Sequence, residues 1–267
     1  MKLVVLAAGK GTRLNTAQTN KCLVKIAGKT LLEHNLDLCL DIKAEEIILV
    51  VGYNASYVKQ FVGDNYKGIS VRYVTQEPQL GIAHAIKLCA PDLTGSFLMC
   101  LSDELLTKPK IVAMKEFFES HGADCVCGMV KDSEERIHTA YTMNLNDKAQ
   151  ILYLLEKPDF AFNEYKGTGY CMFSKSMLLL LETLKKNSKR NEYEMGDWIQ
   201  YAVSKAYQCY GYICGERDFN INTNADLIEA ENYVRRKTND FSEFDYALSQ
   251  KQSDASIYDI IIDEGNT

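Results

Sequence analysis

The residues best suited to chemistry lie in one glycine-containing stretch near the N-terminus, LAAGKGTRL at residues 6–14, with Lys21 following. A short apolar run at residues 3–6 precedes it and is typical of a buried parallel strand. Two alanines and two glycines let the backbone turn sharply and approach a ligand closely. The bare N–H groups of such a loop and the Arg13 guanidinium suit an anion. We expect that anion to be a nucleoside triphosphate.

Two other glycine loops fit this stretch poorly. The dinucleotide-binding pattern G-x-G-x-x-G requires glycine where Leu14 stands. A P-loop that ends at residues 28–30 requires glycine where Leu23 stands. The pattern G-x-G-T-R-L with a lysine shortly after it does fit. A tight turn without a ligand is the structural alternative, and Arg13 and Lys21 within one loop argue against it.

At this point the sequence resembles the sugar-phosphate nucleotidyltransferases, of the glucose-1-phosphate thymidylyltransferase and uridylyltransferase type. These enzymes join an NTP to a sugar 1-phosphate and release pyrophosphate. The resemblance covers about residues 2 to 236 and rests on several motifs in the expected order. The family signature L-A-A-G-x-G-T-R-L is followed by P-K-x-L, and residues 20–23 here are N-K-C-L. The resemblance implies that Arg13 and Lys21 hold the triphosphate, and that the loop binds the nucleotide through Leu6, Ala7, Ala8, Gly9, Gly11 and Thr12.

A second motif, QEPQLGIAHA at residues 76–85, is similar to the family pattern Q-x-x-x-x-G-[LT]-A-x-A. The resemblance implies that Gln76 and the backbone of Gly81 read the edge of a pyrimidine, commonly uracil or thymine. A carboxamide offers a donor and an acceptor together, which suits the imide edge of those bases. Taken alone, Gln76 would be an exposed residue ahead of an ordinary helix. In this motif order, UTP or dTTP is the favoured nucleotide.

Two residues are candidate metal ligands. Asp103 directly follows an apolar strand, at the carboxyl edge where open α/β sheets bind ligands. The resemblance implies that Asp103 coordinates Mg²⁺, which prefers hard oxygen ligands. Many family members read D-I-G-T at the second ligand, and this chain has N-I-N-T with Asn220 in the place of the aspartate. The amide oxygen of Asn220 is then the second ligand, as in the N-acetylglucosamine 1-phosphate branch, with one negative charge fewer.

The acceptor residues implied by the resemblance come from later in the chain. Residues 156–158 match the family motif E-K-P, in which Glu156 contacts sugar hydroxyls and Lys157 contacts the sugar phosphate. Thr168 and Gly169 belong to a strand of small residues that lies against the sugar. Tyr141 lies in the region where many hexose enzymes have a glycine, so a bulky side chain there would reshape the sugar pocket.

The reaction that we expect is in-line nucleotidyl transfer with Mg²⁺. The acceptor phosphate is already anionic near neutral pH and requires no general base, so catalysis reduces to positioning and charge neutralisation. Those tasks fall to four residues: Arg13, Lys21, Asp103 and Lys157.

Two other functions stay open at this stage. The stretch between Arg13 and Lys21 is short, as in cytidylyltransferases, and together with Tyr141 it is compatible with a CTP-dependent enzyme that acts on a small phosphorylated alcohol. A non-catalytic nucleotide-sugar-binding protein is the second alternative, and Asn220 is its only support.

The order of apolar runs predicts the scaffold that positions these residues. Strands and helices alternate, which predicts a doubly wound, mostly parallel but mixed sheet with helices on both faces, the Rossmann-like nucleotidyltransferase fold. Strands are expected at residues 2–7, 46–51, 70–75, 97–101 and 123–130. Helices are expected at residues 30–40, 55–62, 81–89 and 109–120, the last with proline in its first turn.

The second half of the chain has a different pattern. Short runs at residues 139–144, 150–156 and 168–173 predict an antiparallel or mixed extension built onto the sheet. Helices at residues 176–185, 194–205 and 224–236 and strands at 208–214 and 219–221 follow. We expect one nucleotidyltransferase domain over residues 1–236, and a C-terminal tail over 237–267 that packs on it or contacts another subunit.

Charge and cysteine content limit the partners. The net charge of −6 argues against nucleic acid or an anionic membrane as the main partner. Nine cysteines without a C-x-x-C pair predict reduced thiols in a cytoplasmic protein. No segment reads as a signal peptide or a membrane span. We expect small-molecule substrates and leave a homo-oligomer open.

Overall fold

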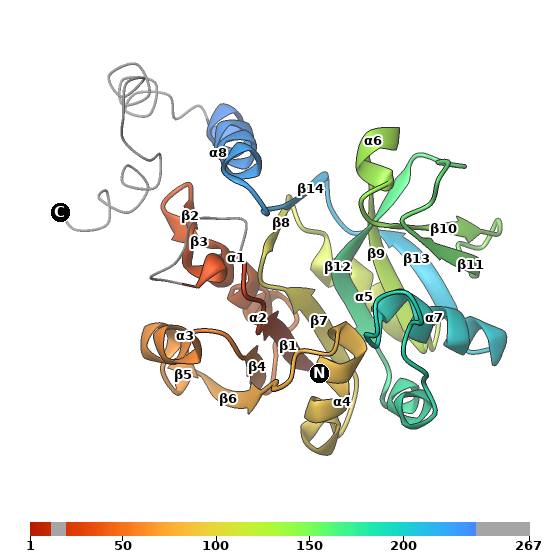
Figure 1. Ribbon diagram of the computed structural model, residues 1–267, viewed down its shortest axis with the longest axis horizontal. Coiled ribbons are helices and arrows are strands. Elements are labelled where there is room, and N and C mark those ends of the chain that lie inside the picture. Colours follow the sequence, from red (N-terminus) through yellow and green to blue (C-terminus); the bar gives the residue numbers. More distant parts are fainter. Residues whose placement is uncertain (12–19, 239–267) are drawn as a thin grey trace.

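A mixed eight-stranded sheet runs through the computed structural model, which describes residues 1–11 and 20–238 (Figure 1). Six strands run in one direction, and β12 and the short β5 run against them. This confirms the predicted mostly parallel, mixed sheet. The strand order is β13 (Cys209–Ile213), β9 (Cys125–Lys131), β12 (Tyr165–Phe173), β7 (Phe97–Leu101), β1 (Lys2–Ala7), β4 (Ile47–Val51), β6 (Ile69–Thr75) and β5 (Asn65–Tyr66).

Helices cover both faces of the sheet, as predicted. Successive side chains of β1 point to opposite faces, so Leu3 and Val5 pack into one core and Val4 into the other. One face carries α1 (Leu31–Leu36), α2 (Leu38–Asp41), α3 (Ala55–Val62) and α5 (Ile111–Ser120). The other face carries α4 (Ile82–Cys89), the 3₁₀ helix η3 (Lys175–Glu182) and α7 (Met195–Ser204).

The ends of β1 and β7 bring two of the predicted motifs together. The two strands are parallel neighbours, with Leu6 paired to Leu101, and Ser102 N–H donates to Leu6 O at 3.1 Å. The glycine loop and Asp103 therefore leave the sheet side by side at its carboxyl edge. The adjacent 3₁₀ helix η1 (Lys21–Leu23) begins at a buried cap, because Asn20 Oδ1 accepts from Cys22 N–H at 3.2 Å.

Of the three strands predicted to extend the sheet, only two lie outside the main sheet. β10 (Tyr141–Leu145) and β11 (Ile151–Glu156) form a separate antiparallel ribbon beside the main sheet (Figure 1). β12, however, lies between β7 and β9 in the middle of the sheet and is antiparallel to both. Residues 166–173 are all buried. The short apolar run resembled an added strand, because the sequence does not show that β9 and β7 leave a gap for it.

A second small ribbon carries the candidate metal ligand Asn220 and begins directly after the other candidate, Asp103. β8 (Glu104–Thr107), which the sequence did not predict, pairs antiparallel with β14 (Arg217–Asn220), and Asn220 lies opposite Glu104. Ile221 N–H donates to Asp103 O at 2.9 Å. This ribbon, with α8 (Asn224–Thr238), packs in a third core cluster on Leu105, Phe219 and Leu227.

The remaining elements are short: β2 (Lys25–Ile26), β3 (Lys29–Thr30), η2 (Ala90–Asp92) and α6 (Glu134–Ile137). The helix predicted at residues 30–40 is divided into α1 and α2, the one at 176–185 is the 3₁₀ helix η3, and Pro109 precedes α5 rather than lying in its first turn. All nine cysteines are buried free thiols. Over residues 1–11 and 20–238, no helix has the length and apolar content to cross a membrane. The predicted tail, beyond Thr238, lies outside the described residues.

Candidate active site

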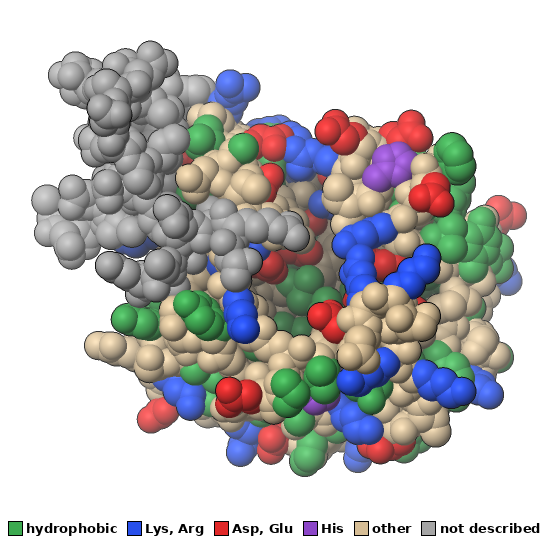
Figure 2. Space-filling view, viewed as in Figure 1, with side chains coloured by type: hydrophobic (Ala, Val, Ile, Leu, Met, Phe, Trp, Pro, Cys, Tyr) green, Lys and Arg blue, Asp and Glu red, His purple; other side chains and the backbone are tan. Residues whose placement is uncertain are grey.

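A cavity of about 480 Å³ opens at the carboxyl edge of the sheet, and Figure 2 shows the hollow with acidic and basic side chains around it. Eight residues predicted from the sequence line it together: Leu6, Ala8, Gly9, Gly11, Lys21, Gln76, Gly81 and Asp103. Ala7, the last residue of β1, instead packs into the hydrophobic core. Thr12 and Arg13 lie outside the described residues.

Lys21 is the centre of the polar arrangement. Its Nζ donates to Asp103 Oδ2 at 2.8 Å and to Asn222 Oδ1 at 2.9 Å, and the residue is only 7% exposed. Gly11 has a φ of +56°, and a Cβ there would be 2.7 Å from Lys21 Cβ. A side chain at position 11 would therefore collide with the lysine stem, which explains a glycine at this position.

The Lys21 contact continues into a chain of amides. Asn222 Nδ2 donates to Asn220 Oδ1 at 2.7 Å, and Asn220 Nδ2 lies 3.5 Å from Glu104 Oε1, a long hydrogen bond. The loop is held by Asp226, whose Oδ2 accepts from Asn222 N–H at 2.9 Å and Thr223 N–H at 2.7 Å. Asn222 lines the cavity, and Asn220 is not among its lining residues. The sequence prediction missed Asn222, although it stands two positions after Asn220 in the same motif.

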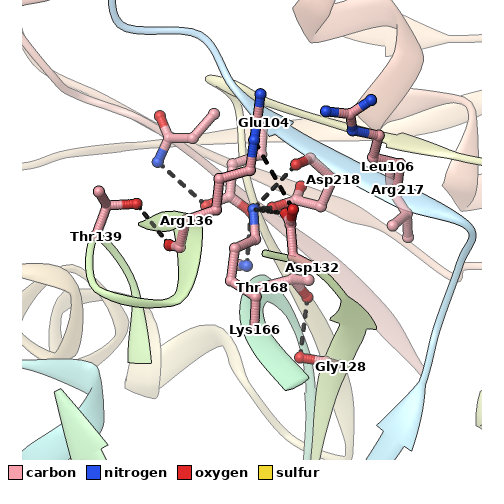
Figure 3. Close-up of polar contacts among 12 residues, drawn as sticks. Glu104, Leu106, Gly128, Asp132, Arg136, Thr139, Lys166, Thr168, Arg217 and Asp218 are labelled. Atoms are coloured by element: carbon pink, nitrogen blue, oxygen red, sulfur yellow. Dashed lines mark hydrogen bonds and ion pairs between the residues drawn. The ribbon is translucent and has the colours of Figure 1, made fainter. Parts of the chain in front are cut away.

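Behind this chain lies a buried group of charges (Figure 3). Lys166 Nζ donates to Asp218 Oδ2 at 2.8 Å and Asp218 O at 2.9 Å, and lies 3.8 Å from Asp132 Oδ2. Glu104 Oε2 accepts from Gly169 N–H at 2.6 Å. Burial raises the pKa of Glu104, Asp218 raises it further, and Lys166 opposes the shift. These contacts join the β8–β14 ribbon to β12.

The segment predicted to read the base is also held in place. Gln76 is 6% exposed, and its Nε2 donates to Gly81 O at 2.9 Å and lies 3.3 Å from His84 Nδ1. Gly81 has a φ of +99°, and a Cβ there would be 2.5 Å from Tyr193 O. Ala83 N–H donates to Tyr193 O at 3.0 Å, and Tyr193 N–H donates to Leu80 O at 2.7 Å. The loop that the sequence predicts to read the base therefore contacts the backbone of a second loop.

That second loop, residues 187–194, lines the cavity with Arg190, Glu192 and Glu194. The sequence prediction assigned this region a structural role around Trp198. Trp198 is fully buried in α7 and its Nε1 donates to Met177 O at 3.1 Å, as expected. The three charged residues that precede the helix were missed, although the resemblance to a family segment at residues 191–200 pointed to this part of the chain.

The predicted acceptor residues lie beyond the cavity's lining. Glu156 ends β11 and Lys157 follows it with a φ of +46°, its N–H donating to Ala140 O at 2.7 Å. Both residues are exposed. Partial loss of hydration and the nearby Glu194 raise the pKa of Glu156. The acceptor motif is thus presented at the end of a ribbon.

Thr168 and Gly169 lie in β12 next to the cavity wall. Thr168 is buried and donates to Gly128 O at 3.1 Å. At Gly169, a Cβ would be 2.5 Å from Leu101 Cγ, so glycine is required for β7 and β12 to approach. Gly169 therefore fits the small-residue strand that the sequence predicted.

The predicted position of Tyr141 in the acceptor pocket is wrong. Tyr141 is 4% exposed and belongs to the core, and its hydroxyl donates to Thr168 O at 2.8 Å. Its ring fills the space that a side chain at Gly167 would occupy. The side chain points inward because the β10–β11 ribbon packs against β12.

The side-chain oxygen atoms around Lys21 are of the kind that binds a divalent cation. Asp103 and Asn222 already hold one cation, the Lys21 ammonium, through a carboxylate and an amide oxygen. Such hard oxygen ligands suit Mg²⁺. Within residues 1–11 and 20–238, no group of three or more His, Cys, Asp or Glu side chains has the arrangement of a complete metal site. Any such ion would need further oxygen ligands from substrate phosphates and water.

A model of the nucleotidyl transferase family matches residues 2–235, almost all of the described chain. The chain belongs to the nucleotidyl transferase family. It is 28% identical to UTP–glucose-1-phosphate uridylyltransferase AglF of Haloferax volcanii, over 91% of this chain and 100% of the relative. It is 27% identical to the bifunctional protein GlmU of Brevibacillus brevis, over 88% of this chain, and it spans about half of that relative, 51%.

A solved structure shares the fold. UDP-glucose pyrophosphorylase in complex with UDP-glucose superimposes with a TM-score of 0.78 at 18% identity, covering 88% of this chain and 98% of the other. The family match and the similarity to AglF confirm the family predicted from the motifs and the class of enzyme, a nucleotidyltransferase.

Proposed function

We propose that this nucleotidyltransferase joins UTP or dTTP to a sugar 1-phosphate and releases pyrophosphate. The observation that carries the proposal is the Lys21 ammonium held by Asp103 and Asn222 in a cavity that also contains Gln76 and Gly81. Phosphate-binding and base-reading groups thus share one cavity. The similarity to the uridylyltransferase AglF along that protein's whole length supports the same substrates.

On the nucleotide side, Lys21 steadies the α-phosphate. Its ammonium has three donors, two of which are used by Asp103 and Asn222. The backbone at Gly9 and Gly11 lines the same cavity and offers close approach to the phosphates. Arg13 is proposed to hold the leaving pyrophosphate, and this role rests on the sequence alone.

The base is proposed to meet Gln76. The Nε2 of this side chain is bound to Gly81 O, so its Oε1 is the end that can accept an N–H from a base. Uracil and thymine present such an N–H at N3, next to carbonyl groups that a backbone N–H can reach.

We propose that the reaction depends on Mg²⁺ bound at Asp103. Bound there, the ion would neutralise phosphate charge. Asn220, the amide ligand predicted from the sequence, stays a prediction. The geometry favours Asn222 as the nearer amide ligand, because Asn222 lines the cavity and shares Lys21 with Asp103.

The acceptor phosphate is proposed to meet Lys157 and the acceptor hydroxyls Glu156, with Thr168 and Gly169 forming the wall behind. The attacking phosphate oxygen is anionic near neutral pH, so these residues orient the acceptor and no general base is needed.

Pyrophosphate release over UTP, dTTP, CTP and ATP, each with glucose 1-phosphate, N-acetylglucosamine 1-phosphate and glycerol 3-phosphate, tests the proposal. We expect turnover with UTP or dTTP and a sugar 1-phosphate. Turnover confined to CTP and glycerol 3-phosphate would identify a cytidylyltransferase of a phosphorylated alcohol. Binding of a nucleotide-sugar without turnover in any combination would identify a non-catalytic binding protein.

The choice of amide ligand has its own test. We expect Asn222→Ala to raise the Mg²⁺ concentration that gives half-maximal activity by about tenfold, more than Asn220→Ala does. The exposed Asn224→Ala, two positions further on, is the matched control and should behave like the wild type. A larger effect from Asn220→Ala would return the ligand to that residue.

A further inference from the structure

We propose that Gln79 binds the 2′-hydroxyl of the nucleotide's ribose, so that the enzyme uses UTP in preference to dTTP. This inference rests on the proposed function, which places the base at Gln76 and the phosphates at Lys21. Gln79 lines the same cavity, and the proposed function assigns it to neither the base nor the phosphates.

Gln79 connects the two ends of the proposed nucleotide site. It stands between Gln76 and Gly81 in the proposed base-reading loop, residues 76–81. Its Nε2 donates to the backbone oxygen of Ala8, which directly precedes Gly9 in the glycine loop. Gln79 therefore bridges the loop that is proposed to meet the base and the loop that is proposed to meet the phosphates.

A glycine in a third loop permits this bridge. At Gly52, which directly follows β4, a Cβ would be 2.9 Å from Ala8 O and 3.2 Å from Gln79 Nε2. A larger residue at this position would push the two groups apart. Ala8 O also accepts from Tyr53 N–H at 3.3 Å, so the oxygen that binds Gln79 has a second backbone contact. The position of Gln79 is thus set by the backbone around it.

The ribose has to lie in this part of the cavity. It joins the base to the 5′-phosphate, so a base at Gln76 and phosphates at Lys21 place the sugar between them. The 2′ carbon is bonded to the carbon that carries the base, whereas the 3′ carbon is one atom further toward the phosphate. Because Gln79 belongs to the base-reading loop, we expect the 2′-hydroxyl to be the nearer of the two hydroxyls.

The carboxamide of Gln79 suits a hydroxyl group. Its Nε2 is committed to Ala8 O, and within residues 1–11 and 20–238 its Oε1 has no hydrogen-bond partner. A ribose hydroxyl can donate to this oxygen. A 2′-deoxynucleotide covers the same oxygen without supplying a donor, which costs the hydration of Oε1. The arrangement therefore favours a ribonucleotide.

The test compares UTP with dUTP, which differ only in the 2′-hydroxyl, as substrates of the wild type and of Gln79→Leu. We expect a kcat/KM about tenfold higher for UTP in the wild type, as one neutral hydrogen bond supports. In Gln79→Leu the ratio should fall to within about twofold of one. Loss of the Ala8 contact alone would slow both nucleotides equally, so the ratio isolates the contact with the hydroxyl.

Two further variants sharpen the test. Gly52→Ala acts on the same contact from the opposite side, because its Cβ would displace Gln79 Nε2. We expect it to lower the ratio to about threefold while Gln79 itself is unchanged. Gln60→Leu, an exposed glutamine on α3, is the matched control and should keep the wild-type ratio. Thermal denaturation checks that each variant is folded.

Equal kcat/KM for UTP and dUTP in the wild type, or an unchanged ratio in Gln79→Leu, would overturn the inference. A loss in Gln79→Leu that disappears with 3′-deoxy-UTP in place of dUTP would also overturn it, since Gln79 would then contact the 3′-hydroxyl. If UTP, dUTP and dTTP all fail while CTP is turned over, the proposed function fails. Turnover of UTP and dUTP with the same ratio in both proteins refutes only the role of Gln79.

Discussion

The proposed nucleotide side and the proposed acceptor side of this site differ in structure. Lys21 and Gln76 are buried, and their polar ends are already hydrogen-bonded to neighbouring residues. Glu156 and Lys157 are exposed at the end of the β10–β11 ribbon, outside the main sheet. The nucleotide side is therefore organised before a substrate arrives, whereas the acceptor side has fewer fixed contacts.

This difference has a physical cause. The nucleotide groups follow parallel strands buried on both faces, and a buried polar group must find partners within the protein. The side chains at the ribbon end are exposed and only partly lose their hydration, so these charged groups need fewer fixed partners. We expect substitutions on the nucleotide side to abolish turnover, and substitutions on the acceptor side to act on substrate affinity.

The largest effect is expected from Asp103→Ala, which should lower kcat about 10³-fold because a charge-stabilising contact is lost at the phosphates. Since Asp103 is partly exposed, thermal denaturation should show a folded protein. Pyrophosphate release measures the rate, and the exposed Asp147→Ala serves as the control. Activity close to wild type in Asp103→Ala would refute the metal position and, with it, the contrast between the two sides.

The same contrast explains what the sequence could predict. The apolar runs at residues 2–7 and 97–101 match β1 and β7 to the residue, because strands buried on both faces are continuously apolar. Their shared carboxyl edge then brings Lys21 and Asp103 together. The motif order was informative here because the site is made where neighbouring strands end.

Other features depend on contacts between distant parts of the chain. Asn220 and Glu104 are 116 positions apart, and only the pairing of β8 with β14 places them opposite each other. β8 has too short an apolar run to stand out in the sequence. Tyr141 was misplaced for the same reason, since its burial follows from the insertion of β12 into the sheet.

Lys157→Ala should raise the KM for the acceptor about 100-fold, with a much smaller change in the KM for the nucleotide. The reason is that an exposed lysine contributes binding to the acceptor phosphate and little to the fold. Initial-rate kinetics with each substrate varied in turn measures the two constants. Lys148→Ala, at the opposite end of the same ribbon, is the matched control. An equal rise in both KM values would show that the two sides are not separate.

Gly81→Ala should disrupt the contact between the proposed base-reading loop and residues 187–194. The φ of +99° is available almost only to glycine, and the new Cβ would be 2.5 Å from Tyr193 O. We expect a loss of about 2 kcal/mol in the free energy of unfolding and a several-fold higher KM for the nucleotide. Gly95→Ala, where a Cβ meets no atom within 4 Å, should leave both unchanged. A stability loss without a change in KM would indicate that the loop contact does not position the base.

The smallest effect concerns the charge of Glu156. Loss of hydration and Glu194 raise its pKa above the ordinary value of 4.5, so the folded state binds this proton more tightly than the unfolded state does. Its contribution to stability is present below pH 4.5 and is lost as the pH rises through the folded pKa. Glu156→Gln should therefore lose less stability than the wild type between about pH 4.5 and neutrality. Urea unfolding at several pH values measures the slope, with Glu135→Gln on the exposed side of α6 as the control. If the free energy of unfolding of Glu156→Gln and of the wild type changed equally with pH, folding would not shift the pKa of this carboxyl.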